Sequence, residues 1–350
     1  MKLKIFSLFL FFSYIISFAQ SERRILNFDF EGIKLEGVFN TPKNKNPKGI
    51  VIIVHGSGKT NAVQQEWHLD VRNAILKAGY ATYMWDKMGC GKSEGVFNYN
   101  QSVQNSADEV IAAIKSLKKQ KIKGADRIGL WGISRAGWIN PIVINKFKNI
   151  SFWISVSGVG PKESFAYLFK ENLKTEGVTK DSIHILQNEL KESYRITHSG
   201  GSFKDYMNAT KNLRKNKFLK RFNEGRVVTE KGYLAYQKEF MKMPFDYKTN
   251  LQIYVQDFES ELLKIKCPVL ALFGEKDTQV DWKKTKALYQ KTLGKTTHFT
   301  TKSFPNCNHN LFTCKTGGFY EFQDDNLPWI RSENFLSTIT NWLNKIEEKI

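Results

Sequence analysis

Apolar segments alternate with amphipathic ones along most of this chain, and this alternation is the strongest constraint on its fold. The unbroken run IVIIV at 50–54 is typical of a strand covered on both faces, as in parallel sheets. Residues 66–78 instead carry apolar side chains at helical spacing. Further strands are expected at 80–86, 127–132, 151–158, 267–274 and 298–304, helices at 103–117, 135–147, 282–293 and 332–350, and two short strands within 25–39. The order predicts an α/β fold with a mostly parallel central sheet flanked by helices.

The alternation stops between residues 161 and 263. This segment is charged, mostly helical in propensity, and without a comparable apolar strand. It is too long for an ordinary loop and is typical of a lid or cap. We therefore expect one α/β core, formed by 20–160 and 264–350, that is interrupted by a largely helical lid at 161–263.

Residues 1–19 have the form of a signal peptide. Lys2 and Lys4 precede an apolar run at 5–18, and Ser17-Phe18-Ala19 has the small-x-small pattern of a cleavage site. The run is shorter than the roughly 20 residues that a membrane span needs. We expect cleavage after Ala19 and export to the periplasm or the outside of the cell, with no membrane span.

The charge of the chain is strongly basic. It carries 53 Lys and Arg against 34 Asp and Glu, a net charge of +19. A solvated surface explains this, and weak attraction to anionic substrates or surfaces is the alternative. The stretch 211–221 poses the same choice, because it has six basic residues and no acidic one. Nucleic-acid binding is not expected, since basic residues are interspersed with acids and match no nucleic-acid motif.

The cysteines leave the disulfide pattern open. The chain has four, Cys90, Cys267, Cys307 and Cys314, and export permits disulfides. Cys307 and Cys314 are near enough in sequence to bridge one loop, whereas Cys267 is expected to act as a small apolar residue. Because the sequence contains no Cys-x-x-Cys or His-x-x-x-His pair, no metal site is expected.

Ser134 lies in GISRA (132–136), where a predicted strand meets a predicted helix. Gly-x-Ser occurs at 91–93, 132–134 and 200–202, but only the second directly follows a buried strand and opens a helix. A sharp strand-to-helix turn exposes the serine hydroxyl above the sheet and needs small residues two positions before and after it. Gly132 and Ala136 are both small. The pattern predicts a nucleophile, against the alternative of an ordinary serine in a tight turn.

A serine nucleophile needs a histidine base, and the base needs a carboxylate. Of the six histidines, His309 lies in a polar loop after the last predicted strand, where a base can reach the top of the sheet. Glu275 and Asp277 both follow the strand at 267–274; we choose Asp277, because the intervening turn carries the chain to the loop tip. The other histidines are His55, His68, His184, His198 and His298.

The oxyanion hole requires two backbone N–H groups that point at the developing negative charge. We expect one from Arg135, the residue after the nucleophile. The other is expected from Ser57 in the loop HGSG (55–58), where glycines let the backbone approach a substrate. His55 is expected to shape this loop and not to act as a base.

Five segments in this order resemble the α/β-hydrolase superfamily: VHGSG, YMWDKMGCGKSEG, GLWGISRAG, CPVLALFGEKDTQV and PNCNHNLF. The second resembles the family's Asp-x-x-Gly-x-Gly-x-Ser turn, which is structural. The most similar members are esterase-like secreted or periplasmic proteins, including serine aminopeptidase-like and dienelactone-hydrolase-like ones. The resemblance implies acyl transfer to water through a Ser134 acyl-enzyme without a cofactor.

The expected activity is hydrolysis of a small carboxylic ester by Ser134, Asp277 and His309. A peptidase that cleaves short peptides with the same triad is the nearest alternative. A non-catalytic binding module is a further alternative, which the filled triad positions disfavour. Haloalkane dehalogenase chemistry is also disfavoured, because the family then carries Asp at the position of Ser134.

Overall fold

The computed structural model of the protein describes residues 21–163, 165–223, 228–295 and 298–347. The strands of its main sheet are β1 (Ser21–Ile25), β4 (Gly37–Pro42), β5 (Ile50–Val54), β6 (Ala81–Trp85), β7 (Ile128–Ile133), β8 (Ile150–Val156), β12 (Val269–Gly274) and β13 (Phe299–Phe304). They are arranged as an eight-stranded sheet in the order β1-β4-β6-β5-β7-β8-β12-β13. Pairing is parallel from β6 to β13, and β4 and β1 add an antiparallel edge. The predicted, mostly parallel sheet is confirmed.

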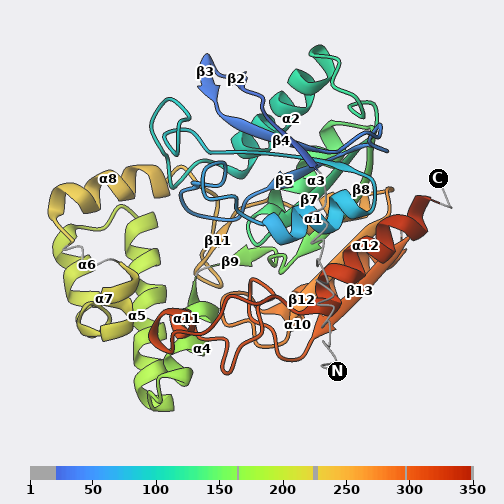
Figure 1. Ribbon diagram of the computed structural model, residues 1–350. Coiled ribbons are helices and arrows are strands. Elements are labelled where there is room, and N and C mark those ends of the chain that lie inside the picture. The colour runs from blue at the N-terminus through green and yellow to red at the C-terminus, as the bar shows by residue number, and fades with distance from the viewer. Residues whose placement is uncertain (1–20, 164, 224–227, 296–297, 348–350) are drawn as a thin grey trace, which may run out of the picture.

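Helices cover both faces of this sheet (Figure 1). One face carries α2 (Val103–Lys119), α3 (Ala136–Lys146), α9 (Phe258–Leu263) and α10 (Trp282–Thr292), and the other carries α1 (Leu69–Lys77) and α12 (Glu333–Glu347). In β5, Ile50, Ile52 and Val54 belong to the first core, whereas Val51 and Ile53 belong to the second. Because successive side chains of a strand point to opposite faces, an unbroken apolar run is what such a strand requires.

One local difference from the predicted elements has a backbone cause. The helix predicted from residue 66 begins only at Leu69, because Glu66 and His68 have positive φ values of 51° and 54°. The two strands predicted within 25–39 are the hairpin β2 (Phe28–Phe30) and β3 (Ile33–Leu35). Its turn is Glu31-Gly32, both with positive φ, as two-residue hairpin turns require.

The insertion separates β8 from β12, two strands that pair directly in the sheet. Its helices are α4 (Ala166–Thr175), α5 (Lys180–His198), α6 (Phe203–Ala209), η1 (Leu213–Lys215), α7 (Lys217–Phe222) and α8 (Glu230–Phe240). They stand to the left of the core in Figure 1, and α4, α5 and α7 share an apolar cluster of their own. The insertion also contains three short strands, β9 (Lys162–Glu163), β10 (Phe245–Asp246) and β11 (Leu251–Ile253), which form a small antiparallel sheet.

The C-terminal limit of the insertion needs adjustment. Phe258 and Leu262 of α9 are buried in the main core, and α9 packs against α3 and α10. We therefore propose to end the lid before Phe258 and not at residue 263. The stretch after the lid contains η2 (Leu293–Lys295) and α11 (Glu321–Asp324) as well as the core elements.

All four cysteines are free thiols. Cys307 pairs with Thr313 in an antiparallel bridge, and the N–H of Cys314 donates to the carbonyl of Asn306. Cys307 and Thr313 are directly opposite each other, so their side chains lie on the same face of the ribbon. Cys314 is the next residue after Thr313, and its side chain therefore lies on the other face. This geometry disfavours the disulfide that the sequence left open.

The predicted signal peptide at 1–19 lies outside the described residues. None of the helices in the described ranges combines the length and apolarity needed to cross a bilayer. Within the same ranges, no three His, Cys, Asp or Glu side chains come together as metal ligands.

Candidate active site

Ser134 occupies the sharp turn between β7 and α3. Its φ is 56°, in the left-handed region that side chains other than glycine rarely adopt. The turn is held by two hydrogen bonds: the N–H of Ser134 donates to Val156 O of β8 at 3.0 Å, and Gly137 N donates to Ser134 O at 2.7 Å. Strain of this kind persists only where the surroundings enforce it and is concentrated at functional sites.

Close packing around the turn explains which small residues the motif needs. A methyl group at Gly132 would lie 2.6 Å from Cβ of Ala136, so one of these two positions must be glycine. A methyl group at Gly137 would lie 2.9 Å from Val159 N and 3.0 Å from Gly158 Cα. Ala136 can therefore replace the motif's last glycine, because the residue that it faces is Gly132, which has no side chain. The other close contact between this helix and its surroundings is made by Gly137.

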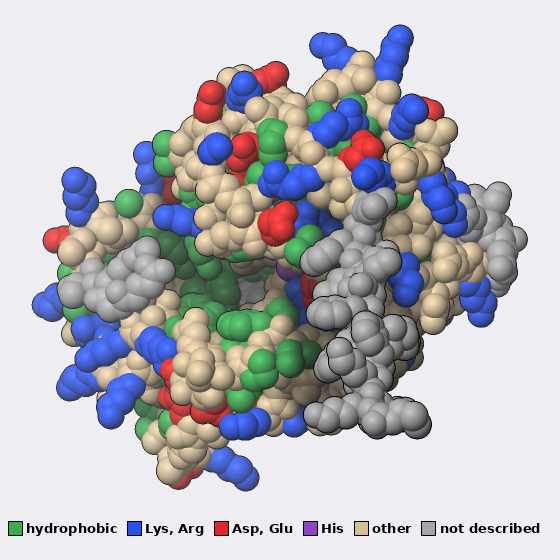
Figure 2. Space-filling model, in the orientation of Figure 1, with side chains coloured by type: hydrophobic (Ala, Val, Ile, Leu, Met, Phe, Trp, Pro, Cys, Tyr) green, Lys and Arg blue, Asp and Glu red, His purple; other side chains and the backbone are tan. Residues whose placement is uncertain are grey.

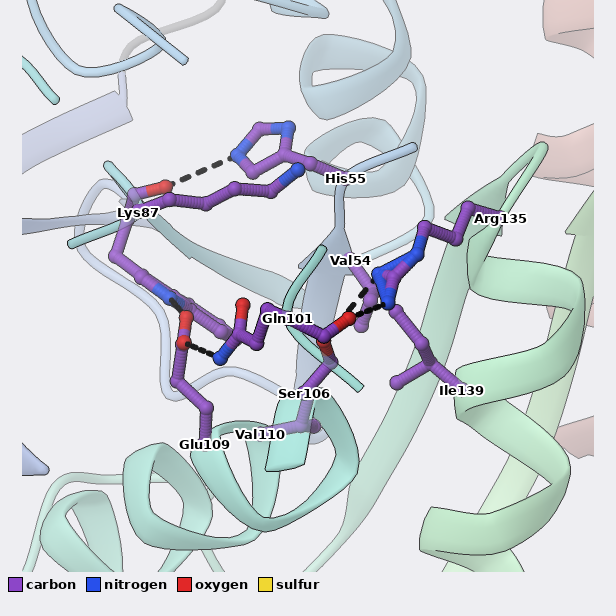
Figure 3. A pocket seen from close by; sticks show the side chains of 10 residues that line it. Val54, His55, Lys87, Gln101, Ser106, Glu109, Val110, Arg135 and Ile139 are labelled. Carbon is purple, nitrogen blue, oxygen red and sulfur yellow. Dashed lines mark hydrogen bonds between the residues drawn. The ribbon is translucent and has the colours of Figure 1, made fainter. Parts of the chain in front are cut away.

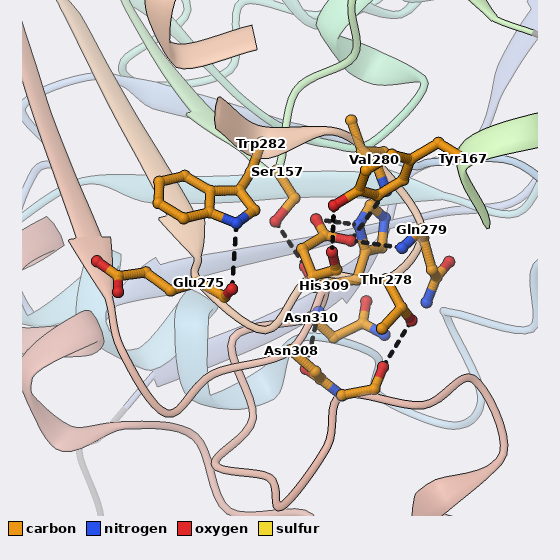
Figure 4. A network of polar contacts seen from close by, with 12 residues as sticks. Ser157, Tyr167, Glu275, Thr278, Gln279, Val280, Trp282, Asn308, His309 and Asn310 are labelled. Carbon is orange, nitrogen blue, oxygen red and sulfur yellow. Dashed lines mark hydrogen bonds and ion pairs between the residues drawn. The ribbon is translucent and has the colours of Figure 1, made fainter. Parts of the chain in front are cut away.

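His309 and Asp277 form a buried pair. Figure 4 shows His309 beside the residues that follow Asp277 in the loop after β12. Asp277 follows β12 and His309 follows β13, and the two residues are 3% and 4% exposed. His309 Nδ1 lies 2.8 Å from Asp277 Oδ2. Asp277 Oδ1 accepts N–H groups of Gln279 at 2.8 Å and Val280 at 3.0 Å. The carboxylate is thus fixed by three contacts, and the imidazole is oriented with Nε2 away from it.

The elbow and the histidine loop are both attached to the end of β8. Val156 accepts the N–H of Ser134, and the hydroxyl of its neighbour Ser157 donates to the carbonyl of His309 at 2.7 Å. The two catalytic candidates are therefore anchored to adjacent residues. In the described part of the chain, no hydrogen bond joins Ser134 Oγ to the imidazole of His309.

The loop after β5 passes directly over Ser134. A methyl group at Gly56 would lie 3.2 Å from Cβ and 3.8 Å from Oγ of Ser134. Gly58 has a φ of 91°, which only glycine adopts readily. Among the hydrogen bonds of the described residues, neither the N–H of Ser57 nor that of Arg135 has a protein acceptor. Both predicted oxyanion donors are therefore available to a ligand.

His55 is built into the support of this loop. Its Nε2 lies 3.0 Å from the carbonyl of Trp85, and its ring stacks on His68 at 6.0 Å between centroids. Burial, reinforced by the nearby positive charge of Lys87, lowers the pKa of His55 to about 3. The imidazole is neutral at ordinary pH and donates to Trp85, which agrees with a structural role.

Two family models match this chain in separate parts. The serine aminopeptidase (S33) model matches residues 45–159, and the dienelactone hydrolase family model matches residues 253–340. The chain belongs to the α/β-hydrolase superfamily. Residues 160–252 of this α/β hydrolase lie between the two matches and make up most of the insertion.

Solved structures of similar fold include an esterase and a peptidase. The Pyrococcus furiosus esterase aligns with a TM-score of 0.54 and 15% identity, over 93% of this chain and 91% of its own. A proline iminopeptidase from Mycobacterium smegmatis aligns with a TM-score of 0.52 and 14% identity, over 92% of this chain and 98% of its own. An uncharacterized 31.7 kDa protein of Escherichia coli, from the traX-finO intergenic region, is 25% identical over 301 residues, which cover 83% of this chain and 92% of that protein.

The side chain of Arg135 in this α/β hydrolase turns toward the segment around α2 (Figure 3). Its guanidinium donates to the carbonyl of Gln101 and to the hydroxyl of Ser106, the latter at 3.3 Å. It borders a cavity of about 20 Å³ that His55 and Lys87 also line. A cavity of this size holds about one water molecule. Arg135 therefore braces the elbow through its side chain.

Sequence reasoning missed Lys87 because the turn that contains it resembles a structural motif. The structural part is as expected: Asp86 Oδ1 accepts the N–H of Ala62 at 2.5 Å, and the Ser93 hydroxyl donates to the carbonyl of Asp86 at 2.6 Å. Lys87, however, extends its ammonium to the carbonyls of Gly56 at 2.6 Å and Gly58 at 2.8 Å. A lysine directly after a buried strand was the available signal.

The insertion also contacts the site. Tyr167 of α4, which Figure 4 shows beside the loop after β12, donates its hydroxyl to the carbonyl of Asp277 at 3.2 Å. Asn172 of the same helix donates to the carbonyl of Thr278 at 3.3 Å. Figure 2 shows the surface hollowed between the core and the insertion, with hydrophobic side chains gathered around the hollow. The insertion is therefore attached to the loop that carries Asp277.

Proposed function

We propose that this α/β hydrolase cleaves carboxylic esters through a Ser134–His309–Asp277 triad and an acyl-enzyme. The observation that carries the proposal is the buried 2.8 Å contact between His309 and Asp277, held beside an elbow that gives Ser134 a φ of 56°. An imidazole oriented by a carboxylate next to a strained, partly exposed serine is the arrangement that activates a hydroxyl for attack.

In the proposed reaction, Ser134 Oγ attacks the ester carbonyl carbon and its proton passes to His309 Nε2. Asp277 stabilises the imidazolium, and the N–H groups of Ser57 and Arg135 stabilise the oxyanion. Collapse of the tetrahedral intermediate breaks the C–O bond, and the alcohol leaves with the proton from His309. Water then attacks the acyl-enzyme with the same base, which releases the acid and restores Ser134. Contacts between nucleophile and base often tighten only when substrate binds.

Two alternatives to ester hydrolysis are an amide-cleaving peptidase and a non-catalytic binding module. An amide-cleaving peptidase is favoured by the serine aminopeptidase model that matches residues 45–159. Esters are our first choice because hydrophobic side chains border the hollow, and an ester substrate needs no partner for a charged amine. A non-catalytic binding module would leave the buried 2.8 Å contact between His309 and Asp277 without a chemical role.

The decisive experiment combines labelling with turnover. The mature protein is treated with a fluorophosphonate, the labelled residue is mapped, and a chain-length series of aryl esters is compared with aminoacyl arylamides. We expect the label on Ser134 and faster turnover of esters. Ser134→Ala should lower turnover by at least about 10⁴-fold. Ser202→Ala, in the exposed Gly-x-Ser of the insertion, is the matched control and should keep full activity. Label on another residue, or activity retained by Ser134→Ala, excludes the mechanism.

The lid at 161–257 is proposed to set substrate specificity, and the protein is proposed to be exported after cleavage near Gln20. Mass spectrometry of the secreted or periplasmic protein tests the export proposal, and an intact Met1 would contradict it. The proposed substrate is a small molecule. We propose that the reaction uses no cofactor or metal and that the protein does not bind nucleic acid.

A further inference from the structure

The ammonium of Lys87 makes two hydrogen bonds that bracket Ser57. It donates to the carbonyl of Gly56 at 2.6 Å and to the carbonyl of Gly58 at 2.8 Å. The backbone of Lys87 is itself fixed, because its N–H donates to Thr60 Oγ1 at 2.7 Å. The lysine thus joins the end of β6 to both sides of the residue proposed to stabilise the oxyanion.

The first of these bonds acts on the oxyanion donor through one peptide group. The carbonyl of Gly56 and the N–H of Ser57 belong to the same planar unit, and the described part of the chain contains no cis peptide bond. In a trans peptide the C=O and N–H point in opposite directions. Holding the carbonyl on the Lys87 side therefore directs the N–H of Ser57 to the other side of the loop. Gly56 itself lies against Ser134, so the Gly56–Ser57 peptide is next to the nucleophile.

We propose that Lys87 is a positioning residue of the oxyanion hole, which orients and polarises the Gly56–Ser57 peptide so that the Ser57 N–H binds the developing negative charge. This inference rests on the proposed function. A cation bound to a carbonyl oxygen draws electrons from the peptide and makes its N–H a stronger donor. Its charge also lies on the favourable side of a site shielded from water, where electrostatic contributions are largest.

The surroundings of Lys87 leave its charge directed at the loop. No ion pair among the described residues includes Lys87. The facing charged or titratable groups are Glu109 of α2, Arg135 at the start of α3, Cys90 in its own turn and His55 of the loop. Glu109 is already engaged, because its carboxylate accepts the indole N–H of Trp85 at 2.6 Å and the amide of Gln101 at 3.0 Å. Figure 3 shows the side chain of Lys87 running beside His55.

Titration gives this role a measurable signature. Burial, followed by the positive charge of Arg135, lowers the pKa of Lys87 to about 8. Below that pH the ammonium is charged and polarises the peptide, and above it the neutral amine loses that effect. Arginine at this position would remain charged throughout the working range.

The test uses Lys87→Met and Lys87→Arg, with Lys92→Met as the matched control, since Lys92 is an exposed lysine of the same turn. The readouts are kcat and KM for an aryl ester, Ki for a trifluoromethyl ketone that mimics the tetrahedral intermediate, and the melting temperature. We expect Lys87→Met to lower kcat about 100-fold and to weaken the ketone similarly, with KM changed less than about threefold. Lys92→Met should leave all of these values unchanged.

The pH profile separates positioning from a purely structural role. For the wild type, kcat should decline as the pH rises through about 8. In Lys87→Arg this decline should move to higher pH. The inference is overturned if Lys87→Met matches Lys92→Met, if its loss is mainly in KM, or if Lys87→Arg keeps the wild-type alkaline decline. Should Lys87→Met not fold, the profile of Lys87→Arg decides alone.

Failure of this inference is distinguishable from failure of the proposed function. If the wild type hydrolyses no ester and the fluorophosphonate leaves Ser134 unlabelled, the proposed function is wrong and the role of Lys87 falls with it. If Ser134 is labelled, the wild type turns over and Lys87→Met is fully active, only the inference about Lys87 is wrong.

Discussion

Gly56 follows β5 and Ser134 follows β7, yet the two residues are in contact. A methyl group on Gly56 would lie 3.2 Å from Ser134 Cβ. This contact places the loop after β5 over the nucleophile. A side chain at position 56 would push this loop and Ser134 apart.

Gly56→Ala should lower kcat about tenfold, because the loop must shift by a few tenths of an ångström, and displacements approaching 1 Å cost about 100-fold. Steady-state kinetics on an aryl ester measures the effect. Gly160→Ala is the control, since a methyl group there meets its nearest neighbour, Thr285 Oγ1, at 3.9 Å. Equal activity of the two variants would show that the loop does not constrain the nucleophile.

Asp277→Asn should lower kcat about 10⁴-fold while the fold remains intact. The amide cannot accept from His309 Nδ1 in the same way, so the imidazole loses the tautomer in which Nε2 is a base. Glu275→Gln is the matched control, because Glu275 is the neighbouring carboxylate and is exposed. A large loss in Glu275→Gln with little loss in Asp277→Asn would reverse our assignment of the acid. Circular dichroism checks that both variants fold.

The folded protein should lose stability as the pH falls from about 6.5. The pKa of His55 is lowered to about 3 in the folded state, so the unfolded chain takes up a proton that the folded chain does not. The free energy of unfolding should therefore decrease with falling pH, by about 2 kcal/mol at pH 5 from this residue alone. Burial also lowers the pKa of His68, which adds to the effect.

Urea denaturation across pH measures this dependence. His55→Gln should flatten it, whatever its effect on stability at neutral pH. His184→Gln, which changes an exposed histidine of α5, should leave the slope unchanged. A wild-type slope that persists in His55→Gln would mean that other groups carry the acid sensitivity.

The basic stretch 211–221 should act on charged substrates only through long-range attraction. Lys215, Lys217 and Lys220 are exposed, whereas Arg221 pairs with Asp324 at 2.8 Å. Replacing the three lysines with glutamine should lower kcat/KM for an anionic ester several-fold at low salt, with no effect on a neutral ester. Replacing Lys119, Lys121 and Lys123, exposed near the end of α2, is the charge-matched control. An identical salt response for both esters would identify the stretch as an ordinary solvated surface.

Patterns confined to neighbouring residues were enough to predict the α/β core, an interruption that begins at about residue 161, and the sharp turn at Ser134 between β7 and α3. The reason is that hydrophobic burial imposes a period on each element, and that period is visible in the residues of the element itself. Parallel strands also end at one edge, so residues after β7, β12 and β13 could be assigned to one site before their contacts were known.

Contacts between distant segments could not be obtained in this way. The hydrogen bonds from Lys87 to the loop after β5 and the return of α9 to the main core depend on which elements become neighbours. Lys87 is the clearest case: its sequence context indicates a turn, and the 2.6 Å bond to Gly56 exists only because β6 lies beside β5. A side-chain hydrogen bond depends on three-dimensional distance and direction, and neither leaves a periodic trace along the chain.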